Sequence, residues 1–121
     1  MATVKEICDY LNKIAPFYMK MDFDNVGFLA GFRDAEVSRV LTALDITGEV
    51  IAEAEELGAE LIVSHHPLIF HPVKSVTDGD PLGRKLIRLL RGGMSAICLH
   101  TNLDAAEGGV NDALMESLGC A

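Results

Sequence analysis

The chain of 121 residues contains no tryptophan and few other aromatic residues, namely two tyrosines and five phenylalanines. Hydrophobic residues nevertheless make up 50 % of the sequence. The apolar content is therefore mostly leucine, isoleucine, valine, alanine and methionine, which typically fill the space between helices and a sheet. With 23 % charged residues the composition is that of a folded protein, which excludes a disordered chain, and the length suits one domain with a real core.

Basic residues are also scarce. The 10 lysines and arginines stand against 18 acidic residues, so the formal charge is −8, and the sequence shows no broad basic face. One basic cluster has the spacing of the outer face of a single amphipathic helix, and we interpret it as a solvated face. It consists of Arg84, Lys85, Arg88 and Arg91. Because neutralising phosphates requires a broader basic footprint, nucleic acid is not expected as a partner.

The three cysteines form no CxxC pair, and their number is odd. Cys8 falls on the apolar face of an expected helix and Cys98 inside an expected strand, so both are predicted to be small buried apolar residues. This usage favours a reducing, cytoplasmic setting. No apolar run approaches the roughly 18 residues of a membrane helix, and the N-terminus has no apolar segment of the signal-peptide kind, so we expect neither feature.

Helical and strand patterns alternate along the chain. Thr3 and Glu6 form a capping-box motif, and apolar residues then recur at helical spacing until Pro16. Further helices are expected over residues 47–57, 81–91 and 110–118, and strands over residues 26–32, 37–44, 61–63 and 95–99. This alternation predicts that residues 1–121 form a single α/β domain, with a parallel or mixed sheet built from βαβ units and flanking helices.

Histidines follow two of the expected strands. Three of the four histidines lie within residues 65–71, and His65 and His66 come directly after a short apolar run. His100 follows a similar run, with Asp104 four residues later. Because the carboxyl ends of parallel strands meet at one edge of a sheet, these side chains are expected to converge there. Imidazole and carboxylate are ligands that first-row metal ions prefer, so the pattern predicts a metal site.

Each of these residues also has an alternative interpretation. Adjacent strand residues point to opposite faces, so His65 and His66 share a site only if the strand stops before them; otherwise one is a core residue and the other is on the surface. Thr101 and Asn102 suit a turn, which either folds Asp104 back to the edge or merely makes cap hydrogen bonds.

The roles of two further residues, Asp45 and His71, stay open. Asp45 either orients an imidazole or belongs to the first turn of the next helix, and we favour the second. His71 either joins the site or lies on an exposed loop.

Four stretches of the chain match a known pattern. They are Asp24-Asn25-Val26-Gly27 and residues 40–45 (VLTALD), 64–70 (SHHPLIF) and 100–112 (HTNLDAAEGGVND). In order and spacing they resemble the Nif-three-like family, whose members are commonly labelled GTP cyclohydrolase I type 2 homologues. The resemblance covers nearly the whole chain, and the two histidine motifs together are highly specific. One departure is Phe23, which stands where the family commonly carries tryptophan.

The resemblance implies an α/β protein with a dinuclear metal site, assembled as a homo-oligomer, often a hexameric ring. It assigns His65, His66 and Asp104 as ligands of two divalent metal ions, and their identity as zinc, iron, manganese or nickel stays open. The family completes this site with a His-x-x-x-Glu motif, and no histidine follows His100 here. We therefore expect an incomplete site, in the N-terminal portion of a longer protein with two similar halves.

Three functions are compatible with these residues. The first is a metal-dependent hydrolase acting on a nucleotide such as GTP or a similar small substrate, with His100 or His71 as the general base. The second is a non-enzymatic metal-binding or regulatory protein that acts through partners. The third is a domain whose histidines are only structural. The chain has no phosphate-binding loop of the GxxxxGK[ST] type, so the residues themselves do not specify GTP.

Overall fold

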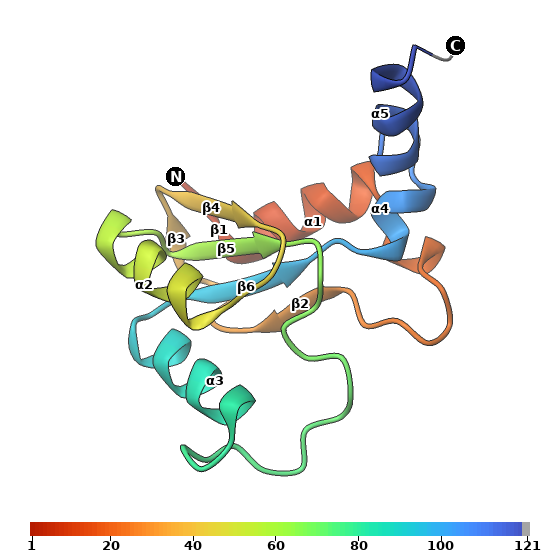
Figure 1. Ribbon diagram of the computed structural model, residues 1–121. Helices are drawn as coiled ribbons and strands as arrows, with labels where there is room; N and C mark the ends of the chain where they lie inside the picture. Colours follow the sequence, from red (N-terminus) through yellow and green to blue (C-terminus); the bar gives the residue numbers. More distant parts are fainter. Residues whose placement is uncertain (120–121) are drawn as a thin grey trace.

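The structure is a computed structural model that describes residues 1–119. Its centre is a four-stranded sheet with the order β2-β6-β5-β4 (Figure 1). Strands β4 (Val40–Ala43), β5 (Leu61–Ser64) and β6 (Ser95–Cys98) run parallel, whereas β2 (Gly27–Ala30) pairs antiparallel with β6. A short antiparallel pair, β1 (Ala2–Thr3) and β3 (Glu36–Val37), lies apart from this sheet. The α/β prediction is thus confirmed, with a mixed sheet.

Helices cover both faces of the sheet (Figure 1). On one face, α1 (Val4–Ile14) packs its apolar residues against Leu61 and Ile97. On the other face, α2 (Gly48–Leu57) and α3 (Pro81–Arg91) enclose the larger core around Ile62 and Ala96. Neighbouring strand residues point to opposite faces, so the apolar runs of β5 and β6 serve both cores.

The helix ends follow their sequence signals. Thr3 and Glu6 form the expected capping box at α1, and Thr47 and Asp80 accept hydrogen bonds from the first turns of α2 and α3. Gly58 ends α2 with a left-handed backbone (φ 70°), which glycine adopts without steric cost. The helix expected near the C-terminus is α5 (Val110–Ser117), which extends away from the sheet in Figure 1.

The single strand expected over residues 37–44 is wrong, because this stretch forms β3 and β4 with a break between them. At the break, the backbone amides of Ser38 and Arg39 donate to Oε1 of Glu60, at 2.7 and 3.2 Å. A side-chain carboxylate therefore takes the place of a strand partner at these two amides, and the ladder is interrupted.

No helix within residues 1–119 has both the length and the apolar content needed to cross a membrane. Cys98 is buried in β6, as the sequence predicts, whereas Cys8 on α1 is only partly buried against the core.

Leu89→Ala is expected to lower the free energy of unfolding by about 2–5 kcal/mol, because it removes a fully buried side chain from the core between α3 and the sheet. Urea unfolding followed by circular dichroism measures the loss. The neighbouring Leu90 is 37 % exposed, so Leu90→Ala is the matched control and should cost less than about 1 kcal/mol. Equal losses in the two variants would contradict the assignment of the buried face.

Candidate metal centre

Three histidines converge where β5 and β6 end. His65 and His66 directly follow β5, and His100 lies two residues after β6. Their ring centroids are 4.9 to 5.4 Å apart, and one ring nitrogen from each lies within 4.8 Å of the others. The prediction that these side chains meet at one edge of the sheet is confirmed.

Each of the three rings has its Nδ1 atom held by an acceptor. His65 Nδ1 lies 2.9 Å from the carbonyl oxygen of Leu99, His66 Nδ1 lies 2.8 Å from Asp45 Oδ1, and His100 Nδ1 lies 3.0 Å from Asp24 Oδ1. A carbonyl or an ionised carboxylate only accepts hydrogen bonds, so Nδ1 carries the proton in each neutral ring. The lone pair then resides on Nε2, which is the arrangement that metal-ligating histidines show.

A turn after β5 brings both adjacent histidines to the same side. The hydroxyl of Ser64 donates to the carbonyl oxygen of His66, two residues later, at 2.8 Å. The amides of His65 and His66 still donate to the carbonyls of Ala43 and Leu44, so the chain stays attached to the end of β4. The ring centroids of His65 and His66 consequently lie 5.3 Å apart, and the two side chains do not point to opposite faces.

Asp45 orients His66 through the 2.8 Å contact, and Thr47 caps α2 instead. The favoured interpretation of Asp45 as part of the first turn of that helix is therefore wrong. Its carboxylate keeps the His66 ring in one tautomer, the role of an acidic residue behind a metal ligand.

Asp24 is the site residue to which the sequence pattern assigned no role. Its side chain is fully buried and accepts hydrogen bonds from His100 Nδ1 and from the amide and hydroxyl of Thr101, at 3.1 and 2.6 Å. Burial by itself raises the pKa of Asp24, but the hydrogen bonds from Thr101 and His100 outweigh it and lower the pKa to about 2. The available signal was the polar pair Asp24-Asn25 between the apolar Phe23 and Val26.

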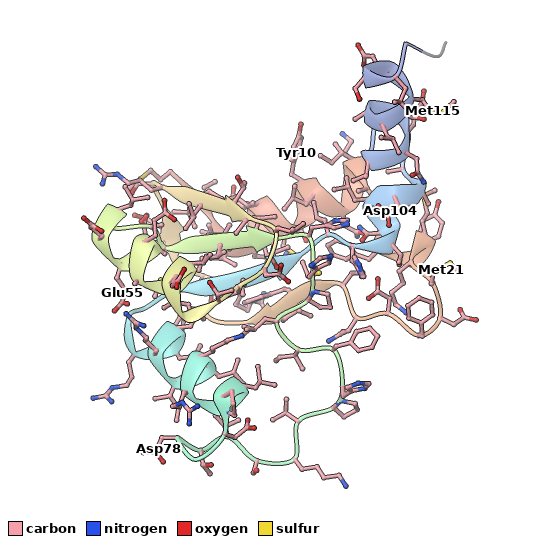
Figure 2. All side chains as sticks on the ribbon, viewed as in Figure 1. Tyr10, Met21, Glu55, Asp78, Asp104 and Met115 are labelled. Carbon is pink, nitrogen blue, oxygen red and sulfur yellow. The ribbon has the colours of Figure 1, made fainter. Side chains whose placement is uncertain are left out.

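Asp104 lies on a helix and not in the expected turn. Residues Thr101–Ala105 form α4, whose first hydrogen bonds run from the amides of Leu103 and Asp104 to the carbonyl of His100. Asp104 Oδ1 is 3.8 Å from His65 Nε2, too far for a hydrogen bond, and the group of side chains with ligand atoms close together contains the three histidines without Asp104. Figure 2 shows Asp104 on α4, next to the strand ends.

Two further residues considered from the sequence, Asn102 and His71, make structural contacts. Asn102 is fully buried and accepts from the amide of His100, the local hydrogen bond that one interpretation predicts, and it also donates to the carbonyl of Ala15, which is distant in sequence. His71 is exposed on the loop after β5, packs against Phe70 and lies outside the group of three histidines.

Comparison with known proteins places this site in a family. The family model described as Duf34/NIF3 (NGG1p interacting factor 3) matches residues 2–121. The chain belongs to the Duf34/NIF3 family. This confirms the resemblance drawn from the motifs around Asp24, His65 and His100.

Individual Duf34/NIF3 relatives are considerably longer. A protein of Clostridium perfringens named GTP cyclohydrolase 1 type 2 homolog is 45 % identical over 116 residues, which are 96 % of this chain and 44 % of the relative. Staphylococcus aureus protein SA1388 matches with a TM-score of 0.91 and 41 % identity over 98 % of this chain and 38 % of its own. A Bacillus cereus protein related to NIF3 matches with a TM-score of 0.90 and 38 % identity, over 98 % of this chain and 32 % of its own. The chain thus spans less than half the length of these relatives.

Asp24→Asn is expected to lower the free energy of unfolding at pH 7 by about 2 kcal/mol, because the lowered pKa of Asp24 means that its charged form stabilises the fold. This contribution is complete above the ordinary carboxyl pKa of 3.8 and is lost as the pH falls toward about 2. Urea unfolding at several pH values should therefore show the gap between wild type and variant narrowing below about pH 4. The exposed neighbour Asp22 provides the control Asp22→Asn. A gap that does not change with pH would contradict the role of the charge.

Proposed function

We propose that this chain binds two divalent metal ions through His65, His66 and Asp104 and forms part of a metal-dependent hydrolase. The observation that carries the proposal is the shared hydrogen-bond pattern of the three imidazoles, each of which leaves Nε2 as the electron-pair donor. The nitrogen and oxygen donors suit zinc, iron, manganese or nickel. Three protein ligands leave coordination positions for water or further groups.

His100 is proposed as the general base. Asp24 accepts the hydrogen bond from Nδ1–H of His100. The Nε2 atom of His100 is therefore the one that can accept a proton from a water molecule among the three rings. Bound divalent ions supply Lewis acidity that lowers the pKa of water to about 7. The His100 ring is partly exposed, with 22 % of its side-chain surface accessible, so it can release the accepted proton to solvent while staying fixed by Asp24.

The substrate class is a nucleotide or a similar small molecule. Support comes from the relatives named GTP cyclohydrolase 1 type 2 homolog, and GTP is therefore the first compound to test. A cytoplasmic location and assembly as a homo-oligomer, such as a hexameric ring, belong to the same proposal.

Regulation through a protein partner is the second candidate function. It is favoured by α5, which leaves the apolar side chains Val110, Leu114 and Met115 between 38 and 53 % exposed, and by the family description as an interacting factor. In that case metal binding should alter partner binding while no turnover is detectable.

His65→Ala and Asp104→Ala are each expected to reduce the bound metal at least tenfold at limiting metal concentration, because each removes a proposed ligand. Elemental analysis of the purified chain after loading with zinc, iron, manganese or nickel measures the content. His71→Ala removes a histidine outside the cluster and should leave the metal content unchanged. Equal metal in all three variants would refute the ligand assignment.

His100→Gln is expected to lower the hydrolysis rate by roughly 100-fold or more while the metal content stays near that of the wild type, because only the proton acceptor is removed. The measurement is turnover of GTP and of phosphoester substrates by the metal-loaded chain. Loss of metal in His100→Gln would make His100 a ligand and not the base. Absence of turnover in the metal-loaded wild type would favour the regulatory function.

A further inference from the structure

Helix α3 carries the densest positive charge of the chain. Its eleven residues, Pro81–Arg91, include three arginines and one lysine and no acidic residue. The chain as a whole has 10 basic residues and a formal charge of −8. A surface helix kept only for solubility normally mixes both signs, so this concentration calls for a specific explanation.

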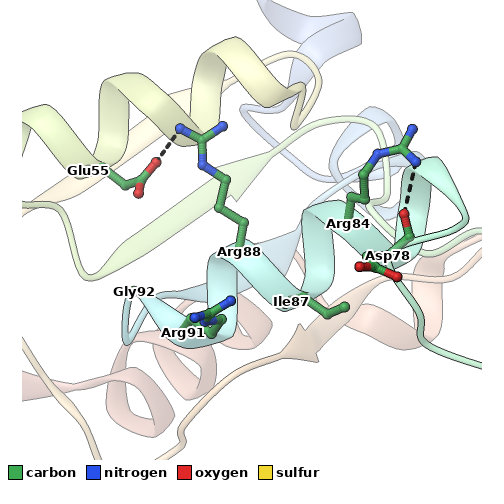
Figure 3. Close-up of a pocket in the computed structure, with 7 residues that line it drawn as sticks. All are labelled: Glu55, Asp78, Arg84, Ile87, Arg88, Arg91 and Gly92. Atoms are coloured by element: carbon green, nitrogen blue, oxygen red, sulfur yellow. Dashed lines mark hydrogen bonds and ion pairs between the residues drawn. The ribbon is translucent and has the colours of Figure 1, made fainter.

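The arginines line a groove between α3, α2 and the turn before α3 (Figure 3). Arg84, Arg88 and Arg91 follow one another at intervals of four and three residues and so share one side of the helix. Glu55 on α2 and Asp78 in the turn complete the walls. The groove has a volume of about 410 Å³, in the range of sites for small molecules and too small for a folded partner.

Only the central arginine is neutralised. Arg88 Nη2 lies 2.6 Å from Glu55 Oε1, the one ion pair in the groove. Arg84 donates from Nη1 to the backbone carbonyl of Asp78 at 3.0 Å, which leaves its charge without a carboxylate partner. Among residues 1–119, the ion pairs include neither Arg84 nor Arg91. The guanidinium groups of Arg84 and Arg91 therefore lie on either side of the neutralised Arg88–Glu55 pair, and most of their N–H donors remain available.

Helix stability does not explain this arrangement. Cations in the last turn, such as Arg88 and Arg91, interact favourably with the helix dipole. Arg84 and Lys85 are the fourth and fifth residues of α3, where the dipole effect of the N-terminus has fallen off, so the dipole does not account for their charge.

We propose that this groove binds a small phosphorylated anion, with Arg84 and Arg91 as its main contacts and Glu55 as a competitor for Arg88. The planar guanidinium group donates two parallel hydrogen bonds to a phosphate, which makes arginine the preferred residue for such ligands. Arg84 and Arg91 are about two helical turns apart, roughly 10 Å along the axis, so their long side chains can converge on the two ends of a diphosphate. The groove is separate from the histidine cluster in its residues.

Inorganic pyrophosphate is the probe, titrated calorimetrically into the metal-free chain at low ionic strength. Saturable binding of one pyrophosphate per chain is expected. Arg84→Ala and Arg91→Ala should each weaken it by roughly tenfold, because each removes charge-assisted hydrogen bonds. Lys13→Ala, which changes the net charge equally at an exposed position on α1, should leave the affinity within about twofold, as expected for a distant, screened charge.

Glu55→Gln provides the opposite test, because it frees the Arg88 guanidinium and should tighten pyrophosphate binding several-fold. Glu53→Gln removes the same charge from an exposed position of α2 and should not. Equal effects of the two glutamine variants would reduce the interaction to general electrostatics and overturn the proposal. Absence of saturable binding, or unchanged affinity in both arginine variants, would do the same. If His65→Ala also weakens pyrophosphate binding, the anion binds at the histidine cluster and the groove proposal is wrong. This outcome does not depend on whether the histidines bind metal.

Discussion

The in-register parallel pairing of β4, β5 and β6 is the constraint on which the histidine cluster depends. Ala43 lies beside Ser64, and Ser64 beside Cys98, at the last level of the ladder. Two residues beyond this level, the segments that follow β4, β5 and β6 carry Asp45, His66 and His100, respectively. A shift of one residue in the pairing of β5 with β6 would move His66 and His100 to different levels of the sheet edge. The hydrogen bonds that hold the rings are thus consequences of how the backbones pair.

The antiparallel strand β2 supplies what the parallel strands lack. Its first residue, Gly27, lies opposite Cys98 at the end of β6, so the segment before β2 runs alongside the segment after β6. Continuing this register places Asp24 opposite Thr101, and Asp24 indeed accepts from both the amide and the hydroxyl of Thr101. An antiparallel strand begins at the edge where parallel strands finish, which is how a residue 76 positions earlier reaches His100.

Local signals made much of the fold predictable from sequence. The caps Thr3, Thr47 and Asp80 act within one turn of their helices, so their motifs sufficed. The convergence of the histidines is predictable because the carboxyl ends of parallel strands lie at one edge of the sheet. The break before β4 did not, because it depends on Glu60, which is distant in sequence. The role of Asp45 beside His66 is one of two interpretations that the sequence offers and not the favoured one, and Asp24 beside His100 has no assigned role, since a carboxylate in a loop has no local pattern that specifies its hydrogen-bond partner. The α4 helix was read as a turn because its first turn rests on contacts to Asp24 and Ala15.

The three Nδ1 contacts also bear on when the site becomes ordered. The rings of His65, His66 and His100 are each held by a protein acceptor, on Leu99, Asp45 and Asp24 respectively. Because these acceptors belong to the chain itself, the loss of rotamer freedom of the three rings is part of folding. In small zinc domains the opposite holds, and removal of the metal unfolds the chain. Here the two cores of the sheet are built from apolar residues and include none of the histidines, so the fold does not rest on an ion at this site.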